Sequence, residues 1–160
     1  MNTFAYDAML HELQNQLGPE TLQWQEEAQM PTLIIDAVII TELLKILRDQ
    51  FGFNHLANLT AVDYKDELEM VYHLSHIPGA RNLAIKCRLA PDNPSIASVS
   101  NLYPTADWQE REAYDLMGIE FVGHPNLVRI LLPDDFEGHP LRKDFKRKDW
   151  QDVITSIKEA

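Results

Sequence analysis

Two neighbouring segments, residues 69–76 and 82–89, alternate between apolar and polar side chains and constrain the fold more than any other feature. Because successive side chains of a strand point to opposite faces, Met70, Tyr72 and Leu74 share one face. A Pro-Gly pair stands between the segments, where the chain has to turn. The pattern predicts an antiparallel pair of strands with one buried face.

Apolar residues three and four positions apart predict helices elsewhere in the chain. Residues 40–51 show this spacing most clearly, and Gly52 follows where a helix can end. Residues 6–17 and about 105–117 show it as well, each before a glycine. Shorter alternating stretches predict further strands at residues 21–27, 33–35 and 56–63.

The sequence from Ile119 to Phe145 keeps neither period, because prolines break any helix and glycines break any strand. It is nevertheless rich in large apolar residues. A segment so irregular and so apolar is expected to lie against its own domain or another protein. The apolar residues are Phe121, Leu127, Ile130, Leu131, Leu132, Phe136, Leu141 and Phe145.

With 160 residues, these elements predict a single α+β domain. We expect a two-layer sandwich: a mixed, mostly antiparallel sheet with helices on one face, followed by an extended C-terminal arm. Residues 1–118 form the α+β domain. Residues 119–160, called the arm below, belong to the same structural unit.

Composition excludes several classes of protein. The formal net charge of -11 repels phosphate backbones, so nucleic acid is not expected as a partner. No stretch approaches the ~20 apolar residues that span a bilayer, and no secretion signal is expected at the N-terminus. The glycine-rich nucleotide motifs and the Gly-x-Ser-x-Gly nucleophile motif do not occur.

Cysteine and histidine give little support for a metal site. The single cysteine, Cys87, excludes an internal disulfide and a self-contained iron–sulfur cluster, and its alternating segment predicts a buried thiol. His124 and His139 each precede a proline in the arm. They either bond backbone carbonyls, which we favour, or contribute to a metal site with Glu137.

The helix expected over 105–117 carries the densest polar run, Glu110-Arg111-Glu112. Glu112 lies four residues from both Trp108 and Leu116, so we expect it on a buried stripe. Arg111 has an acid four residues away on either side, Asp107 and Asp115, at the spacing of helical ion pairs.

Two interpretations of the carboxylates remain open. Glu112 and Asp115, three residues apart, raise each other's pKa unless a cation intervenes, and such a pair could perform acid–base catalysis. The alternative, which we favour, is a structural charge cluster paired with an arginine such as Arg129 or Arg142.

A basic stretch from Leu141 to Lys148 follows the acidic body of the chain. It could be a solvated end, a nucleic-acid arm or a strip that docks on an acidic protein. Phe145 and Trp150 among the charges favour contact with protein.

The stretch Glu110-Arg-Glu-Ala-Tyr-Asp-Leu-Met-Gly-Ile-Glu-Phe-Val-Gly-His-Pro-Asn-Leu-Val-Arg-Ile-Leu-Leu-Pro resembles a family signature. The family is that of the 30 kDa subunit, or C subunit, of NADH-quinone oxidoreductase in respiratory complex I. Its pattern asks for Glu-Arg-Glu, an acid and then a His or Lys, which Asp115 and His124 provide. It then prefers a basic residue or Pro, where this chain has Val128 and, one position on, Arg129.

Similarity extends beyond the signature, from about Leu56 to Phe145. Residues 133–145 resemble the C-terminal motif of the family, and Tyr72-His73-Leu74 resembles its central strand. The resemblance implies a non-redox structural subunit of the peripheral arm, without catalytic residues of its own. Its arm would dock on a partner chain.

The resemblance also implies where the chemistry lies. NADH, flavin, iron–sulfur clusters and quinone would belong to partner subunits, and no cofactor to this chain. The partners would be the hydrogenase-like large subunit (the D-type subunit), near the quinone site, and neighbouring iron–sulfur subunits. The complex would hold the chain peripherally on the cytoplasmic side of the cell membrane, without a membrane span of its own.

The resemblance assigns structural and docking roles to ten residues. They are Glu110, Arg111, Glu112, Asp115, His124, Arg129, His139, Arg142, Lys143 and Asp144.

Two alternatives keep their place beside this hypothesis. Closely similar domains occur in energy-converting hydrogenases, formate hydrogenlyase and other donor:quinone dehydrogenases, so the machine could be one of these. The other alternative is an independent hydrolase or metal enzyme that uses Glu112, Asp115 and His124.

Overall fold

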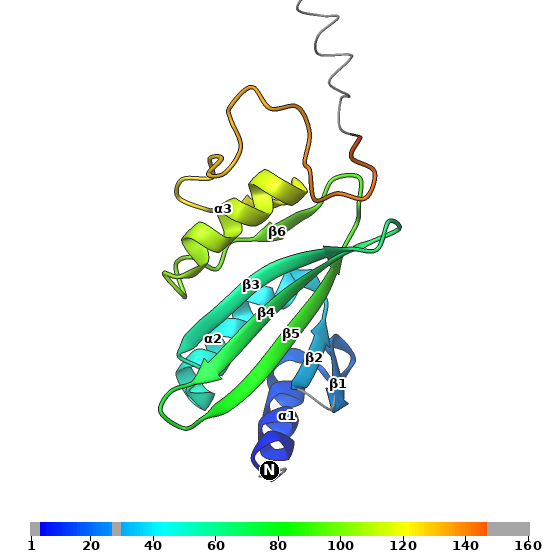
Figure 1. Ribbon diagram of the computed structural model, residues 1–160. Helices are drawn as coiled ribbons and strands as arrows, with labels where there is room; N and C mark the ends of the chain where they lie inside the picture. The colour runs from blue at the N-terminus through cyan, green and yellow to red at the C-terminus, as the bar shows by residue number, and fades with distance from the viewer. Residues whose placement is uncertain (1–3, 27–29, 147–160) are drawn as a thin grey trace, which may run out of the picture.

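The computed structural model describes residues 4–26 and 30–146, which are built around a five-stranded sheet (Figure 1). Its strands are β1 (Leu22–Glu26), β2 (Pro31–Ile35), β3 (His55–Asp63), β4 (Leu68–His76) and β5 (Arg81–Leu89). They lie in the order β1-β2-β5-β4-β3, and only β2 and β5 pair in parallel. The mixed, mostly antiparallel sheet is confirmed.

The hairpin of β4 and β5 is the centre of the sheet, as its alternation predicts. Tyr72 pairs with Ile85 and Met70 with Cys87, and all four side chains are buried. Burial raises the pKa of the Cys87 thiol to about 12, so the thiol stays protonated at neutral pH. The buried, inert cysteine is confirmed.

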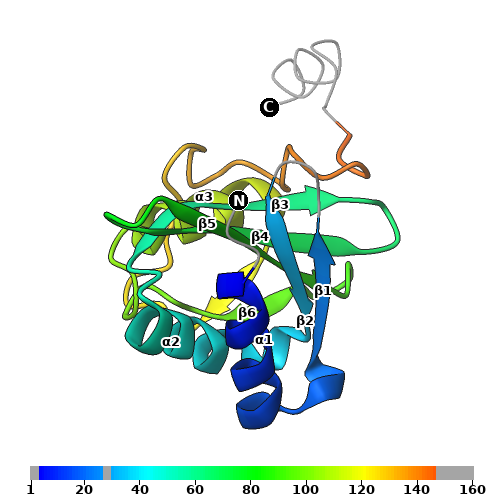
Figure 2. The same cartoon turned by 90° about the horizontal axis from the view of Figure 1, so that it is seen from below.

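Helices α1 (Phe4–Leu17) and α2 (Ile40–Phe51) lie on one side of this sheet (Figure 2). The apolar stripe of α2 is fully buried against it, and Gly52 ends the helix in the left-handed region at φ 73°. Two short 3-10 helices, η1 (Pro19–Thr21) and η2 (Ala37–Ile39), precede β1 and α2. The two-layer α+β sandwich is therefore confirmed.

A small second sheet was not expected from the sequence. Strands β6 (Ser95–Ala97) and β7 (Glu120–Val122) pair in parallel, and helix α3 (Ala106–Met117) connects them. Ile96 and Phe121 carry this sheet into the main core. The first residues of the arm are thus a strand, where we expected irregular chain, because three residues are too few to show a period.

Helix α3 packs along the outer edge of β3. The Gln109 side chain accepts the backbone N–H of Leu59, and the Thr105 hydroxyl donates to the Leu56 carbonyl at 3.1 Å. The arm then passes over α3 without regular structure (Figure 1). No helix in residues 4–26 and 30–146 has the length and apolar character needed to cross a membrane.

Candidate functional site

Asp115, on the last turns of α3, holds the arm at its middle. The side chain is fully buried, and its Oδ2 accepts the backbone N–H groups of Ile130, Leu131 and Leu132 at 3.1, 2.8 and 2.9 Å. Three successive amides around one oxygen form a concave site for an anion. The irregular path of the arm therefore has a specific determinant on the helix.

Arg129 supplies the opposing charge. Its Nη1 lies 3.5 Å from the Oδ1 of Asp115, so the predicted pairing of the cluster with an arginine of the arm is confirmed. Burial pushes the pKa of Asp115 upward, but the three amides and Arg129 outweigh it and hold the pKa below its usual value. Asp115 is therefore an ionised anchor.

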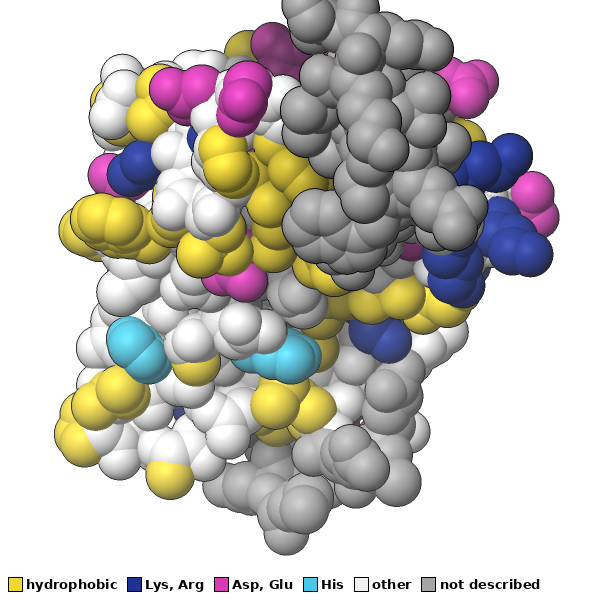
Figure 3. All heavy atoms as spheres, turned by 45° about the horizontal axis from the view of Figure 1, so that its top comes forward, with side chains coloured by type: hydrophobic (Ala, Val, Ile, Leu, Met, Phe, Trp, Pro, Cys, Tyr) yellow, Lys and Arg dark blue, Asp and Glu magenta, His cyan; other side chains and the backbone are white. Residues whose placement is uncertain are grey.

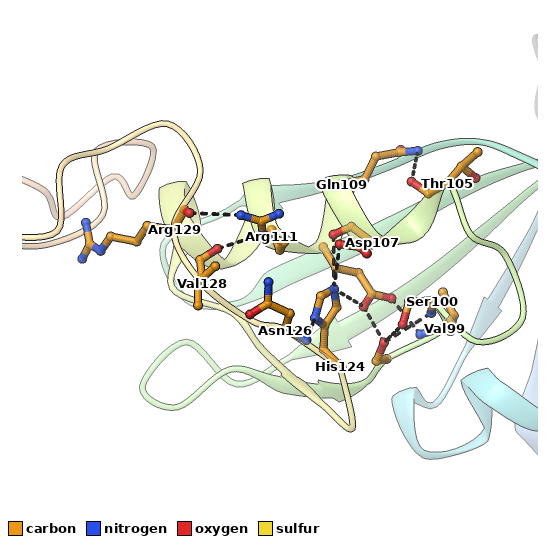
Figure 4. A network of polar contacts seen from close by, with 12 residues as sticks. Val99, Ser100, Thr105, Asp107, Gln109, Arg111, His124, Asn126, Val128 and Arg129 are labelled. Atoms are coloured by element: carbon orange, nitrogen blue, oxygen red, sulfur yellow. Dashed lines mark hydrogen bonds and ion pairs between the residues drawn. The ribbon is translucent and has the colours of Figure 1, made fainter.

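Arg111 holds the adjacent part of the arm (Figure 4). Its Nε and Nη2 donate to the carbonyls of Val128 and Arg129 at 3.1 and 3.3 Å, and its guanidinium lies 5.0 Å from the ring centre of Trp108. The predicted helical ion pairs of Arg111 are wrong. Asp115 is taken by the arm and Asp107 lies 3.5 Å from His124, so Arg111 neutralises backbone carbonyls instead.

Glu110 ties α3 to the chain before it. Its carboxylate is fully buried, accepts the Ser98 hydroxyl at 2.6 Å and the Val99 N–H at 2.7 Å, and lies 3.9 Å from His124. Burial raises the pKa of Glu110, although the two hydrogen bonds and the histidine oppose the shift. Ser98 was missed in the sequence, where nothing distinguishes it from other serines.

His124 bonds backbone, as we favoured. Its Nδ1 accepts the Asn126 N–H at 3.0 Å, which places the ring proton of the neutral form on Nε2. Nε2 then donates to the Asp107 carbonyl at 3.2 Å (Figure 4). The ring fixes the start of the arm to the first turn of α3.

His139 serves the far end of α3 in the same way. Its Nδ1 lies 2.9 Å from the Asp115 carbonyl, and its ring packs where Gly118 has no side chain. Two residues on, the Leu141 N–H donates to the Leu116 carbonyl at 3.1 Å. No group of three potential metal ligands occurs in the described part of the chain, so the structure gives no support to a metal site with Glu137.

Arg142 and Lys143 hold the end of the described arm through Asp63. Asp63 Oδ2 accepts the Lys143 N–H at 2.8 Å and lies 3.4 Å from Nε of Arg142, whose Nη2 donates to the Pro91 carbonyl at 3.1 Å. Asp144 lies 3.7 Å from the same guanidinium. The backbone N–H of Lys143 is the main cause that lowers the pKa of Asp63. Asp63 was missed, because its partner is 80 residues away.

Glu112 lies where we did not expect it. The side chain is exposed, as is Trp108, which keeps 63% of its accessible surface. The predicted buried stripe is wrong because α3 turns its small residues and Glu110 inward. Since Glu110 and Glu112 are about 200° apart around the helix, burying one exposes the other.

The residues proposed for an independent enzyme do not form a site. Asp115 binds arm amides, His124 binds the Asp107 carbonyl, and Glu112 faces solvent. The acid–base pair of Glu112 and Asp115 therefore has no geometric support. The basic stretch beyond residue 146, with Trp150, lies outside the described residues.

Comparison with known proteins matches the geometry to a family. Residues 33–151 match the family described as the 30 kDa subunit of respiratory-chain NADH dehydrogenase. The NADH-quinone oxidoreductase C subunit of Moorella thermoacetica is 48% identical over 142 residues, which are 88% of this chain and 95% of that protein.

Two solved structures share the fold. The trypsin-resistant fragment of Nqo5 aligns with a TM-score of 0.66 at 24% identity, over 77% of this chain and 99% of that one. A chain of the archaeal membrane-bound sulfane sulfur reductase, a respiratory membrane complex, aligns with a TM-score of 0.76 at 23% identity. That alignment covers 97% of this chain and 92% of the other.

Proposed function

This chain belongs to the family of the 30 kDa subunit of respiratory-chain NADH dehydrogenase, and on that premise we propose that it is a non-redox structural subunit of a proton-translocating NADH:quinone oxidoreductase. The relatives that carry the family name are subunits of such complexes. In this proposal the chain supports electron transfer from NADH to quinone by holding its partners in place.

The surface around α3 and the arm is the proposed docking site. The inward contacts of Arg111, Asp115 and Leu141 fix the arm beside α3 but leave large apolar side chains on the outside. Apolar side chains gather on this face with acidic ones around them (Figure 3). We call four of them the outer α3 surface: Trp108, Val128, Leu131 and Leu141, which keep 63%, 47%, 60% and 58% of their accessible surface.

This exposed apolar surface is the observation that carries the proposal, because contiguous apolar surface on a soluble domain is typical of a binding site. The partner in this proposal is the hydrogenase-like large subunit (the D-type subunit), beside the quinone site, with iron–sulfur subunits as neighbours. NADH, flavin, clusters and quinone would then lie on those chains. The complex would place this chain on the cytoplasmic side of the membrane.

The ten family residues gain a division of labour in this proposal. Glu110, Asp115, His124, Arg129, His139 and Arg142 are turned inward, and their contacts give the arm its shape. Residues 1–118 and the arm thus act as one structural unit. Docking itself would depend on the outward side chains between these anchors.

A second candidate keeps the architecture and changes the complex. The fold likeness to a chain of the sulfane sulfur reductase covers almost the whole sequence, which fits a subunit of a related energy-converting complex. The 48% identity to an NADH-quinone oxidoreductase relative over 88% of this chain favours the first proposal.

Affinity purification of the tagged chain from its own cells tests the function. We expect the large subunit, the iron–sulfur subunits and NADH:quinone activity to copurify. Trp108→Ala with Leu131→Asp is expected to reduce recovery at least tenfold, because loss of central interface residues costs roughly 2 kcal/mol or more. Val38→Asp, at an apolar residue 80% exposed on η2, is the matched control and should behave as wild type. Recovery of the wild-type chain alone would contradict the proposal.

A further inference from the structure

A groove lies between the outer edge of β3 and α3, and the contacts that anchor the arm do not account for it. Its volume is about 210 Å³. Ala113, Leu116 and Met117 of α3 line it together with Leu141 of the arm, while Ala57 to Ala61 of β3 form the opposite wall. The lining is mostly apolar.

Glu112 lies at this groove and is exposed. In residues 4–26 and 30–146 its carboxylate has neither a hydrogen bond nor an ion pair, in contrast to Glu110 and Asp115 on the same helix. Water satisfies such a charge in the free chain. A protein that covers the outer α3 surface would remove this water, and a buried carboxylate without a partner is costly.

The groove favours a single side chain over an added strand. The Leu59 N–H, on the outer edge of β3, is already bonded by Gln109, and the register of β3 with β4 shifts between Leu56 and Asn58. An incoming strand would meet an occupied and irregular edge. The apolar lining suits the aliphatic stem of a lysine or arginine, whose charged end would then reach Glu112.

We propose that this groove receives one cationic side chain, a lysine or arginine, of the large subunit on which the chain docks. The inference rests on the proposed function and adds the chemistry of the contact. The net charge of -11 agrees with it, because an acidic chain attracts a partner that presents basic groups. Glu112 is the specific acceptor of that charge.

Binding of the full-length chain to the purified large subunit of the same complex tests the proposal. We expect Glu112→Gln to weaken binding about 30-fold or more, as for loss of one partner of a buried charge pair, and to reduce its salt dependence. Ala57→Trp, which fills the groove from the exposed edge of β3, should weaken binding as well. Glu120→Gln, at another exposed acid, is the control and should bind as wild type.

The outcomes separate the two proposals. Unchanged melting temperatures of the isolated variants, with weaker binding by Glu112→Gln and Ala57→Trp only, support the cationic contact. Wild-type binding that Glu112→Gln leaves unchanged overturns the cationic contact and leaves the docking function standing. A wild-type chain that does not bind the large subunit overturns both.

Discussion

Replacing Asp115 with alanine is expected to detach the middle of the arm and to lower the free energy of unfolding by about 3–5 kcal/mol. The substitution leaves the N–H groups of residues 130–132 without their acceptor and leaves Arg129 as a partly buried, unpaired cation. Breaking a buried ion pair from one side costs this much because the other charge stays behind. Urea denaturation of the isolated chain measures the loss.

The arm should also become a substrate for proteases in this variant. Limited proteolysis is expected to cut Asp115→Ala first within residues 123–141, while the sheet stays intact. Asp134→Ala, at an exposed acid of the arm, should change stability by less than about 0.5 kcal/mol. If Asp115→Ala unfolds like wild type and resists the protease equally, the arm is held by something other than Asp115.

The second large effect separates two glutamates that are two residues apart. Glu110→Ala is expected to cost about 3 kcal/mol, because it leaves the buried Val99 N–H and the Ser98 hydroxyl without their acceptor. Glu112→Ala should cost less than about 0.5 kcal/mol, because Glu112 is exposed. Thermal and urea unfolding of the two variants side by side measure the difference.

Glu110→Gln is the control for charge in this experiment, because its amide can keep both hydrogen bonds. Since burial raises the pKa of Glu110, the folded state of the wild type loses stability as the pH rises through that raised pKa. Glu110→Gln lacks this loss and should gain on the wild type over the same rise. Equal costs for Glu110→Ala and Glu112→Ala would mean that α3 presents a different face to the core.

The regular elements were predictable because each depends on local patterns. Alternation produced the β4–β5 hairpin, and apolar spacing with a terminal glycine produced α2 and α3. The short strands β6 and β7 were not predictable, because each has three residues and its partner lies beyond a helix. Pairing across such a distance depends on tertiary packing.

The site was predictable in its residues and not in its geometry. The motif singled out Glu110, Asp115 and His124, but periodicity placed Trp108 and Glu112 inside. Hydrophobicity is a poor guide to α3, because its buried carboxylates are satisfied by amides of distant loops. That exchange leaves a tryptophan outside, which is the arrangement expected of a helix with a second protein to cover it.

Hydrogen–deuterium exchange on the full chain, alone and within its purified complex, tests most directly whether α3 and the arm are the docking surface. We expect assembly to slow the exchange of amides in residues 106–117 and 123–141. The β4–β5 turn and the η2 region, around Ile77 and Val38, should exchange equally in both states. Protection confined to those two regions, with the arm unchanged, would contradict the docking of this chain through α3 and its arm.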